Sequence, residues 1–395
     1  MRHRDLSLEK KEREVFIVLR STFDVAVIFE RCFETIGKAF QFLMKELRVT
    51  CFSSTSCPPR GEWIRTPLVM RPPDQPLGYG LAAPRNGARS LLSALQAHVI
   101  KWLLFDSRPQ TKDNKCDVPP DTYLRPSEER QEEALWRACS EVIWRCGGGN
   151  SSQAGVDPKA VVALPTDHCY VQHSSQYYQD GVTEKFQTED GVGALLLLYA
   201  CVLSRGCDNI RKDLDGKITH LVSAHVEGSI NIVTLLLTGR ATPYLHNGVL
   251  YVGDEDHYAM PQFGILSRSP VGLLVWYGGE ENSKNNINKQ YPGSRLKTPA
   301  LPIWATKISL FKELTEYRRE TTTALCFAAF DIHYYTCGGC NVLLNVDTRA
   351  HDDAVGTLRT DDISATPLEK LIHTKWQDAK ITWTGNTPYV GEPAK

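Results

Sequence analysis

The chain has 395 residues, of which 42% are hydrophobic and 23% are charged. This composition provides enough apolar side chain to bury a large core, and it excludes a disordered or collagen-like chain. Lys and Arg (45) nearly balance Asp and Glu (46), so the formal net charge is -1. We therefore expect no nucleic-acid binding through bulk positive charge.

The sequence predicts neither a membrane span nor secretion. The longest apolar run, 192–203, is shorter than the ~20 residues that a span requires. The first residues, MRHRDLSLEKKERE, are charged, and no signal-peptide pattern follows them. The twelve cysteines are scattered, and Cys201 and Cys326 lie in apolar segments, as is typical of reduced thiols. We expect a cytoplasmic or nuclear protein.

The first half of the chain is predicted to be mainly helical. Apolar residues recur every three or four positions over 29–47, which predicts a helix within an N-terminal extension, residues 1–48. We expect this helix to pack on the protein's own core; a partner helix is the alternative. Further helices are expected over 90–105, 127–146, 192–203 and 230–237, with Gly147 and Gly239 as terminating residues.

The second half of the chain is predicted to be mainly β-structure. Strands are expected over 160–164, 249–252, 325–335 and 342–346, together with short strands around Gly and Pro turns within 264–276 and a last short strand that ends at 382–383. A turn over 336–341 would join two of them. With helices crowded in the first half and strands in the second, the fold class is α+β, and residues 49–395 form a single domain with a β-rich C-terminal part.

Several blocks of sequence carry a resemblance to a known family. They are Tyr79-Gly80 with the helix that follows, LLLYACVLSRG (196–206), VTLLLTGRA (233–241), LKTPALPIW (296–304) and, more weakly, HTKWQDAKITWTG (373–385). On these blocks the chain resembles the MINDY deubiquitinases, most closely the family's fourth branch. The resemblance implies a papain-like cysteine-peptidase fold and, as ligand, ubiquitin chains joined through ubiquitin's own lysine forty-eight.

The resemblance also reveals three departures at the catalytic positions. Active members carry a Gln, then a Gly-Pro-Cys turn, then a helix whose N-terminus favours the thiolate. Here Arg89 stands at the nucleophile position and Ala83 at the position of the oxyanion Gln. The turn that would carry the catalytic His is missing after Trp304, because ATK leads directly into ISLF. A guanidinium stays protonated and cannot attack a carbonyl, so the site is predicted to be inactive.

No other residue is predicted to replace the missing nucleophile and base. Ser90 is expected to cap the helix, and His98 is expected to be packed or half-exposed. His168 and Cys169 are adjacent in sequence, so their side chains would point to opposite sides of a strand.

Two further groups of residues are weak candidates for metal binding. Cys337 and Cys340 form a lone CxxC pair with only His333 nearby, and the interpretation that we favour is a turn with two spare thiols. The acidic residues of 254–257 read as a solvated turn. We therefore expect no metal and no cofactor.

The sequence thus predicts an inactive deubiquitinase that binds lysine-forty-eight-linked ubiquitin chains without cleaving them. Two alternatives stay open. One is an active, thiol-dependent, linkage-specific deubiquitinase like the rest of the family. The other is an interaction scaffold without affinity for ubiquitin.

Overall fold

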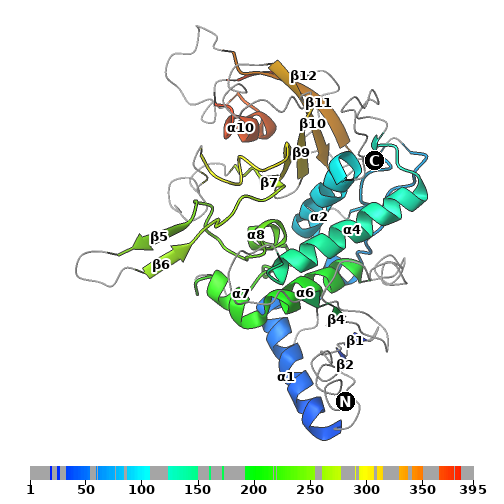
Figure 1. Cartoon of the computed structure of the whole chain (residues 1–395), viewed down its shortest axis with the longest axis vertical. Helices are drawn as coiled ribbons and strands as arrows, with labels where there is room; N and C mark the ends of the chain where they lie inside the picture. The colour runs from blue at the N-terminus through cyan, green and yellow to red at the C-terminus, as the bar shows by residue number, and fades with distance from the viewer. Residues whose placement is uncertain are drawn as a thin grey trace, which may run out of the picture.

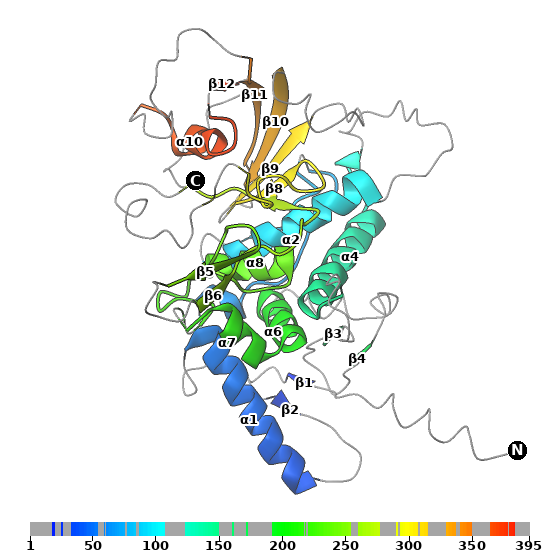
Figure 2. The ribbon, with the colours of Figure 1, turned by 60° about the vertical axis from the view of Figure 1, so that its left-hand side comes forward.

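The structure is a computed structural model in which helices form the body of the molecule and a sheet covers one end of it (Figure 1, Figure 2). It describes residues 18–19, 25–26, 33–53, 59, 61–75, 77–83, 87–106, 123–149, 160–161, 171–172, 192–216, 218, 220–253, 260–276, 290, 293–306, 309–314, 329–336, 340–349, 364–377 and 379–383.

Four helices surround the main core. They are α2 (Arg89–Lys101), α4 (Glu128–Cys146), α6 (Gly193–Arg205) and α8 (Ile230–Thr238). The chain continues from α2 into a π-helical turn, η2 (Trp102–Asp106). The long helix α1 (Phe33–Phe52) and the short α7 (Cys207–Asp213) lie beside α6. A 3-10 turn, η1 (Gly61–Ile64), also contacts α6.

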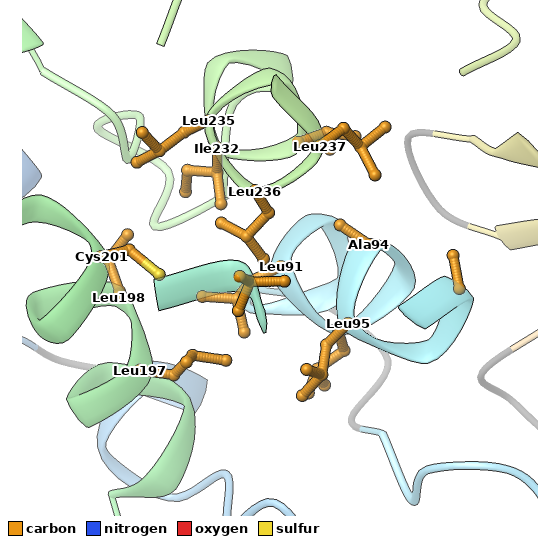
Figure 3. Close-up of a cluster of buried hydrophobic side chains, with 14 of the residues drawn as sticks. Leu91, Ala94, Leu95, Leu197, Leu198, Cys201, Ile232, Leu235, Leu236 and Leu237 are labelled. Carbon is orange, nitrogen blue, oxygen red and sulfur yellow. The ribbon is translucent and has the colours of Figure 1, made fainter. Parts of the chain in front are cut away.

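The centre of the core is built where α2, α6 and α8 meet (Figure 3). It contains Leu91, Ala94 and Leu95 from α2, Leu197, Leu198 and Cys201 from α6, and Ile232, Leu235, Leu236 and Leu237 from α8. Every residue of α2 from Ser90 to Ile100 is buried. A helix that is buried on all sides is held in place by its neighbours, so α2 is a fixed support for whatever lies at its ends.

The strands between residues 272 and 383 form a six-stranded sheet, in the order β12-β11-β10-β9-β8-β7. Its strands are β7 (Gly272–Leu273), β8 (Ile303–Ala305), β9 (Ser309–Leu314), β10 (Ala329–Thr336), β11 (Cys340–Asp347) and β12 (Lys380–Trp383). All neighbouring pairs are antiparallel except β7 with β8.

Helices lie on both faces of this sheet. The side chains of β10 alternate, so Phe330 and Ile332 pack toward α10 (Pro367–His373), whereas Tyr335 joins the main core on the side of α2. A capping box fixes the start of α10, because Thr366 and Glu369 each bond the other's backbone N–H. The sheet is therefore held between α10 and the first part of the chain.

The remaining strands form two-stranded ribbons. They are β1 (Val18–Leu19) with β2 (Val25–Ala26), β3 (Ala160–Val161) with β4 (Val171–Gln172), and β5 (Val249–Val252) with β6 (Met260–Phe263). The β5–β6 hairpin projects from the body (Figure 1). It exposes several large apolar side chains.

Most of the elements expected from the sequence are present. The helices that correspond to 90–105, 127–146, 192–203 and 230–237 are confirmed, and Gly239 ends α8 in the left-handed conformation at a φ of 78°. The strands β5, β10 and β11 are also confirmed. The α+β class, with helices first and most strands later, agrees with the element order.

Three expectations need correction. Of the short strands expected within 264–276, one is present as Gly272–Leu273, and the rest of the range is not a strand; Pro270 has no N–H, and the Ser269 hydroxyl bonds to the end of α8. The helices α7 and α10 were not expected, because seven residues give too few turns for a clear periodicity. The turn over 336–341 is shorter than expected, because Thr336 already pairs with Cys340.

The predicted division between an extension, 1–48, and a domain, 49–395, falls inside α1. Leu47 is fully buried in the main core, so the last turns of this helix pack on the body of the protein. The division itself stays a prediction.

Among the described helices, none alone has the length and hydropathy of a membrane span; only α6 and α7 taken together, with a bend of 85° between them, reach those values.

Candidate functional site

The candidate site lies at the start of α2, where the sequence places the degenerate nucleophile. Arg89 is the first residue of the helix and is partly exposed, while Ala88 and Ser90 on either side are buried. Ala88 is the N-cap residue, and its methyl group cannot accept a hydrogen bond from the first turn. A cation at this end also opposes the helix dipole, so Arg89 is not there to stabilise the helix.

Ala83 is held near this helix by the segment that precedes it. The Gln96 side chain, from the middle of α2, donates from Nε2 to the Tyr79 carbonyl over 2.8 Å and accepts from the Leu81 N–H over 2.5 Å. At Gly80, a Cβ atom would lie 2.0 Å from the Tyr335 hydroxyl oxygen, so only glycine fits between α2 and β10. Ala83 follows and packs partly buried against the core, and its methyl side chain offers no hydrogen-bond donor to an oxyanion.

A tight turn, residues 223–228, covers the other side of the helix start. The Gly228 N–H donates to the Gly87 carbonyl over 3.0 Å, and the Trp63 indole N–H donates to the Val226 carbonyl over 2.8 Å. Val226 adopts a φ of 67°, which is strained for a β-branched residue. Gly61 and Gly87 contact this turn at Val226. Their φ values of 67° and 74° lie in the left-handed region, which a residue with a side chain would adopt only with strain.

The expectation that Ser90 caps α2 is wrong. Ser90 is the second residue inside the helix, and its side chain packs against Gly228, where an added Cβ would lie 2.1 Å from Oγ. The residue is 3% exposed, and Oγ has no hydrogen-bond partner among the residues that the structure describes. Without an adjacent base to take its proton, this hydroxyl is not an activated nucleophile.

The connection between β8 and β9 passes close to α2, one helical turn beyond Arg89. Ser93 Oγ donates to the Thr306 carbonyl over 2.8 Å. Because β8 ends at Ala305 and β9 begins at Ser309, three residues, 306–308, join the two strands, and none of them is a histidine. The loss of the His turn after Trp304 stays a prediction.

His98 lies too far along α2 to act on a group at Arg89. Nine residues of α-helix separate the two, which corresponds to roughly 13 Å along the axis. His98 is fully buried, and its Nδ1 lies 3.3 Å from Glu141 Oε2. Burial lowers the pKa of His98 more than the Glu141 carboxylate raises it, so the imidazole is neutral at pH 7. The expected role as a packed histidine is confirmed.

Glu141 is the charged centre of this buried group. Lys101 Nζ lies 3.1 Å from its carboxylate, and Arg145 Nη2 lies 2.7 Å from it. Burial alone would raise the pKa of Glu141, but His98, Lys101 and Arg145 together hold it well below its usual range. The group ties α2 to α4 and has a structural role.

Five cysteines have side chains that the structure describes. Burial raises the pKa of four of them, Cys51, Cys139, Cys201 and Cys207, so these four are not activated thiols. The fifth, Cys146, is buried and directs its thiol to the Leu235 carbonyl over 3.6 Å. All of them belong to the main core except Cys207, which packs against it.

Several weaker candidates lie outside the described residues: His168, Cys169, Cys337 and the acidic run 254–257. Cys340 begins β11. Within the ranges that the structure describes, no three His, Cys, Asp or Glu side chains gather in a group that could hold a metal ion.

Two residues that shape the site were not identified from the sequence. A signal for Gln96 exists, since it is a lone amide in the apolar run LLSALQAHVI, where a polar side chain needs a buried partner. No local pattern marks Val226, because its strain arises from contacts with residues far away in the sequence.

Comparison with known proteins identifies relatives of this chain. Residues 48–190 and 184–385 match the family model described as "Deubiquitinating enzyme MINDY-3/4, conserved domain". A probable ubiquitin carboxyl-terminal hydrolase MINDY-4 from Mus musculus is 29% identical over 388 residues, which cover 90% of this chain and 48% of the relative. The protein of that name from Xenopus tropicalis is 30% identical over 370 residues, which cover 87% of this chain and 45% of the relative.

A more distant relative is the ubiquitin carboxyl-terminal hydrolase MINDY-3 of Bos taurus, which is 24% identical over 264 residues, or 58% of this chain and 54% of the relative. The chain spans about half the length of the curated relatives it matches. No solved structure matches it.

Proposed function

Because the chain belongs to the MINDY-3/4 family of deubiquitinating enzymes, we propose that it is a pseudo-deubiquitinase that binds lysine-forty-eight-linked ubiquitin chains without cleaving them. The observation that carries this proposal is Arg89 as the first residue of α2. In the active members of the family this position holds the nucleophilic cysteine.

The chemistry of thiol-dependent cleavage needs three groups, and none of them is offered at this site. The nucleophile must give an electron pair to the carbonyl carbon, which a protonated guanidinium cannot do. The base that would take the thiol proton is missing from the β8–β9 connection, where residues 306–308 include no histidine. The oxyanion donor is replaced by Ala83, and the loss of one such donor alone reduces turnover about 100- to 1000-fold.

The surroundings support a papain-like arrangement of the site. α2 packs against β8 and β9, so the helix start and the strand that would carry the base come from opposite halves of the chain and meet at one place. The segment 79–83 is fixed beside α2 by Gln96, as an oxyanion-bearing segment would have to be. On this proposal, the helix, strands and segment 79–83 that frame the site are retained relative to active members of the family, while the reacting groups are replaced.

Binding and bond cleavage use separable contacts. Interactions that hold the globular part of ubiquitin contribute equally before and during the reaction, so they survive the loss of groups that act only in the transition state. A protein with this site can therefore retain chains, shield them or scaffold other factors on them.

A ubiquitin probe with a C-terminal electrophile tests the loss of activity. The full chain is expected to form no covalent adduct, while an active cysteine deubiquitinase in a parallel reaction is labelled completely. A labelled band that disappears after alkylation of the thiols would show an active enzyme and contradict the proposal.

Binding is tested separately with immobilised lysine-forty-eight-linked diubiquitin. The full chain is expected to be retained, and retention should be lost when free ubiquitin chains compete. Absence of retention together with absence of labelling would favour the scaffold without ubiquitin affinity.

A further inference from the structure

We propose that the β5–β6 hairpin is a self-association surface and that its occupant is a second copy of this chain, joined strand to strand through the outer edge of β5. The hairpins of the two copies then form one continuous antiparallel sheet around a two-fold axis. This inference goes beyond the proposed function, since it requires neither a catalytic site nor ubiquitin.

Exposed apolar side chains gather on this hairpin, which projects from the body of the molecule (Figure 1). In the part of the chain that the structure describes, seven large hydrophobic residues are exposed, and six of these lie within 250–266. The six are Leu250, Tyr251, Val252, Met260, Phe263 and Leu266. A two-stranded ribbon with both faces in water is marginally stable by itself, so burial of these side chains against a partner is favourable.

The backbone of β5 directs its polar groups alternately toward β6 and away from it. In an antiparallel pair, hydrogen-bonded and non-hydrogen-bonded positions alternate along the strands. The Gly264 N–H donates to the Gly248 carbonyl over 2.9 Å, so the bonds to β6 recur at the even-numbered residues of β5. The odd-numbered residues, Val249 and Tyr251, therefore present their N–H and C=O groups at the outer edge of β5.

The two edges of the hairpin differ in what they offer. On β6, Pro261 lies opposite Tyr251 and has no N–H, and the Phe263 carbonyl already accepts the Thr242 hydroxyl over 2.7 Å. On β5, none of the described strands pairs with the outer edge, and its sequence VLYV contains no charge or proline that would discourage pairing. The outer edge of β5 is thus the open edge of this hairpin.

A second copy fits this edge because β5 is complementary to itself. When two β5 strands run antiparallel, Val249 of each copy lies opposite Tyr251 of the other, and each of these pairs exchanges both N–H···O bonds. Leu250 then lies on the two-fold axis opposite the second Leu250, in the kind of pair that brings side chains closest together. No side chain within this short ladder is charged.

The two ends of β5 carry opposite charges, which favours a copy that runs in the opposite direction. At the start of β5, the Arg295 N–H donates to the Asn247 side chain over 2.7 Å, so Arg295 lies beside this end. Beyond the other end, the sequence continues from Gly253 with the acidic residues of 254–256. Antiparallel pairing places the end of one β5 beside the start of the other, so opposite charges are brought together at both ends of the ladder.

Sedimentation equilibrium of the 395-residue chain over a series of concentrations tests the association. We expect a reversible equilibrium between monomer and dimer. Leu250→Lys removes two apolar side chains from the contact and sets two like charges opposite each other, so it should raise the dissociation constant of the dimer about tenfold or more. Met260→Lys is the matched control and should leave the dimer in place. Met260 is 65% exposed and shares a face with Leu250, but it lies on β6, away from the open edge.

A cross-linking experiment tests the register of the two strands. The Cα atoms of a non-hydrogen-bonded antiparallel pair lie about 4.5 Å apart, which a disulfide can span. With oxidised glutathione as the oxidant, Leu250→Cys should therefore give a disulfide-linked dimer on a non-reducing gel. Met260→Cys should give no more cross-link than the unsubstituted chain, whose own cysteines set the background.

Several results would overturn the inference. The first is a chain that stays monomeric at every concentration tested. The second is a dimer that Leu250→Lys and Met260→Lys weaken equally, because the contact would then be the apolar face and not the edge. The third is a dimer in which Leu250→Cys gives only the background of cross-linking. A monomer whose retention on immobilised diubiquitin is lost in Leu250→Lys would assign the hairpin to ubiquitin instead of a second copy.

Discussion

The indole N–H of Trp63 donates a hydrogen bond of 2.8 Å to the carbonyl oxygen of Val226 and so joins two segments that lie 163 positions apart in the sequence. Both segments border the start of α2, since Gly87 lies against Glu62 on one side and bonds to Gly228 on the other. The bond fixes the turn over 223–228 even though Val226 has a φ of 67°. Strain of this kind persists only where surrounding contacts determine the backbone.

Substitution at Val226 is expected to reverse the usual order of alanine and glycine. Both variants lose the valine side chain, but alanine keeps a strained left-handed backbone, whereas glycine adopts that conformation without cost. We expect Val226→Gly to be more stable than Val226→Ala by about 1 kcal/mol in urea unfolding. A more stable alanine variant would show that the turn is not left-handed at this residue.

Truncation of Leu47 tests whether α1 belongs to the body of the protein. Leu47 is fully buried, and its replacement by alanine removes core contacts and leaves a cavity. The free energy of unfolding is expected to fall by about 2–5 kcal/mol for Leu47→Ala. Phe42→Ala is the control on the same helix, since Phe42 is 64% exposed and its loss should be nearly neutral. Similar stability for both variants would favour the alternative that the apolar face of α1 binds a partner protein.

The free energy of unfolding should depend on pH through the protonation of His98. Its pKa is lowered in the folded protein, chiefly by burial, so below pH 6.5 the unfolded chain binds a proton that the folded chain does not. Stability is therefore full above pH 6.5 and falls as the pH decreases. Between pH 6.5 and 5, the free energy of unfolding should fall more steeply than in His98→Gln, by up to ~1.4 kcal/mol per pH unit. Equal slopes would mean that His98 is protonated in the folded protein.

Restoring a single group should not restore catalysis. Arg89→Cys places a thiol at the start of α2, where the helix favours a thiolate, and it should react with iodoacetamide. It still lacks a base after Trp304 and a donor at Ala83, so no cleavage of ubiquitin chains is expected. A base contributes about 100- to 10,000-fold, and an oxyanion donor contributes about 100- to 1000-fold.

A combined variant completes this experiment. Arg89→Cys with Ala83→Gln and a His-bearing turn inserted after Trp304 should recover measurable trimming of lysine-forty-eight-linked chains. Efficient cleavage by Arg89→Cys alone would show that a base is already present and would contradict the account of the β8–β9 connection given above.

Local sequence patterns were sufficient for the helices, whereas the assignment of the catalytic positions stays a prediction that the resemblance implies. The periodicity of apolar residues marks α2, α4, α6 and α8, because each helix must bury one stripe or its whole surface. Arg89 and Ala83 could be assigned because they lie within a few residues of one another, in a stretch whose pattern is read along the chain.

The roles of single side chains at the site were decided by the tertiary structure. Ser90 is a residue type that often caps helices. However, it lies two positions after the N-cap Ala88, and with Gly228 against it the buried hydroxyl has no partner in the described part of the chain. Val226 and Trp63 depend on each other across 163 positions, and no local pattern records such a contact. The physical reason is that secondary structure follows from neighbours in the chain, whereas burial, strain and hydrogen-bond partners follow from which distant segments the fold brings together.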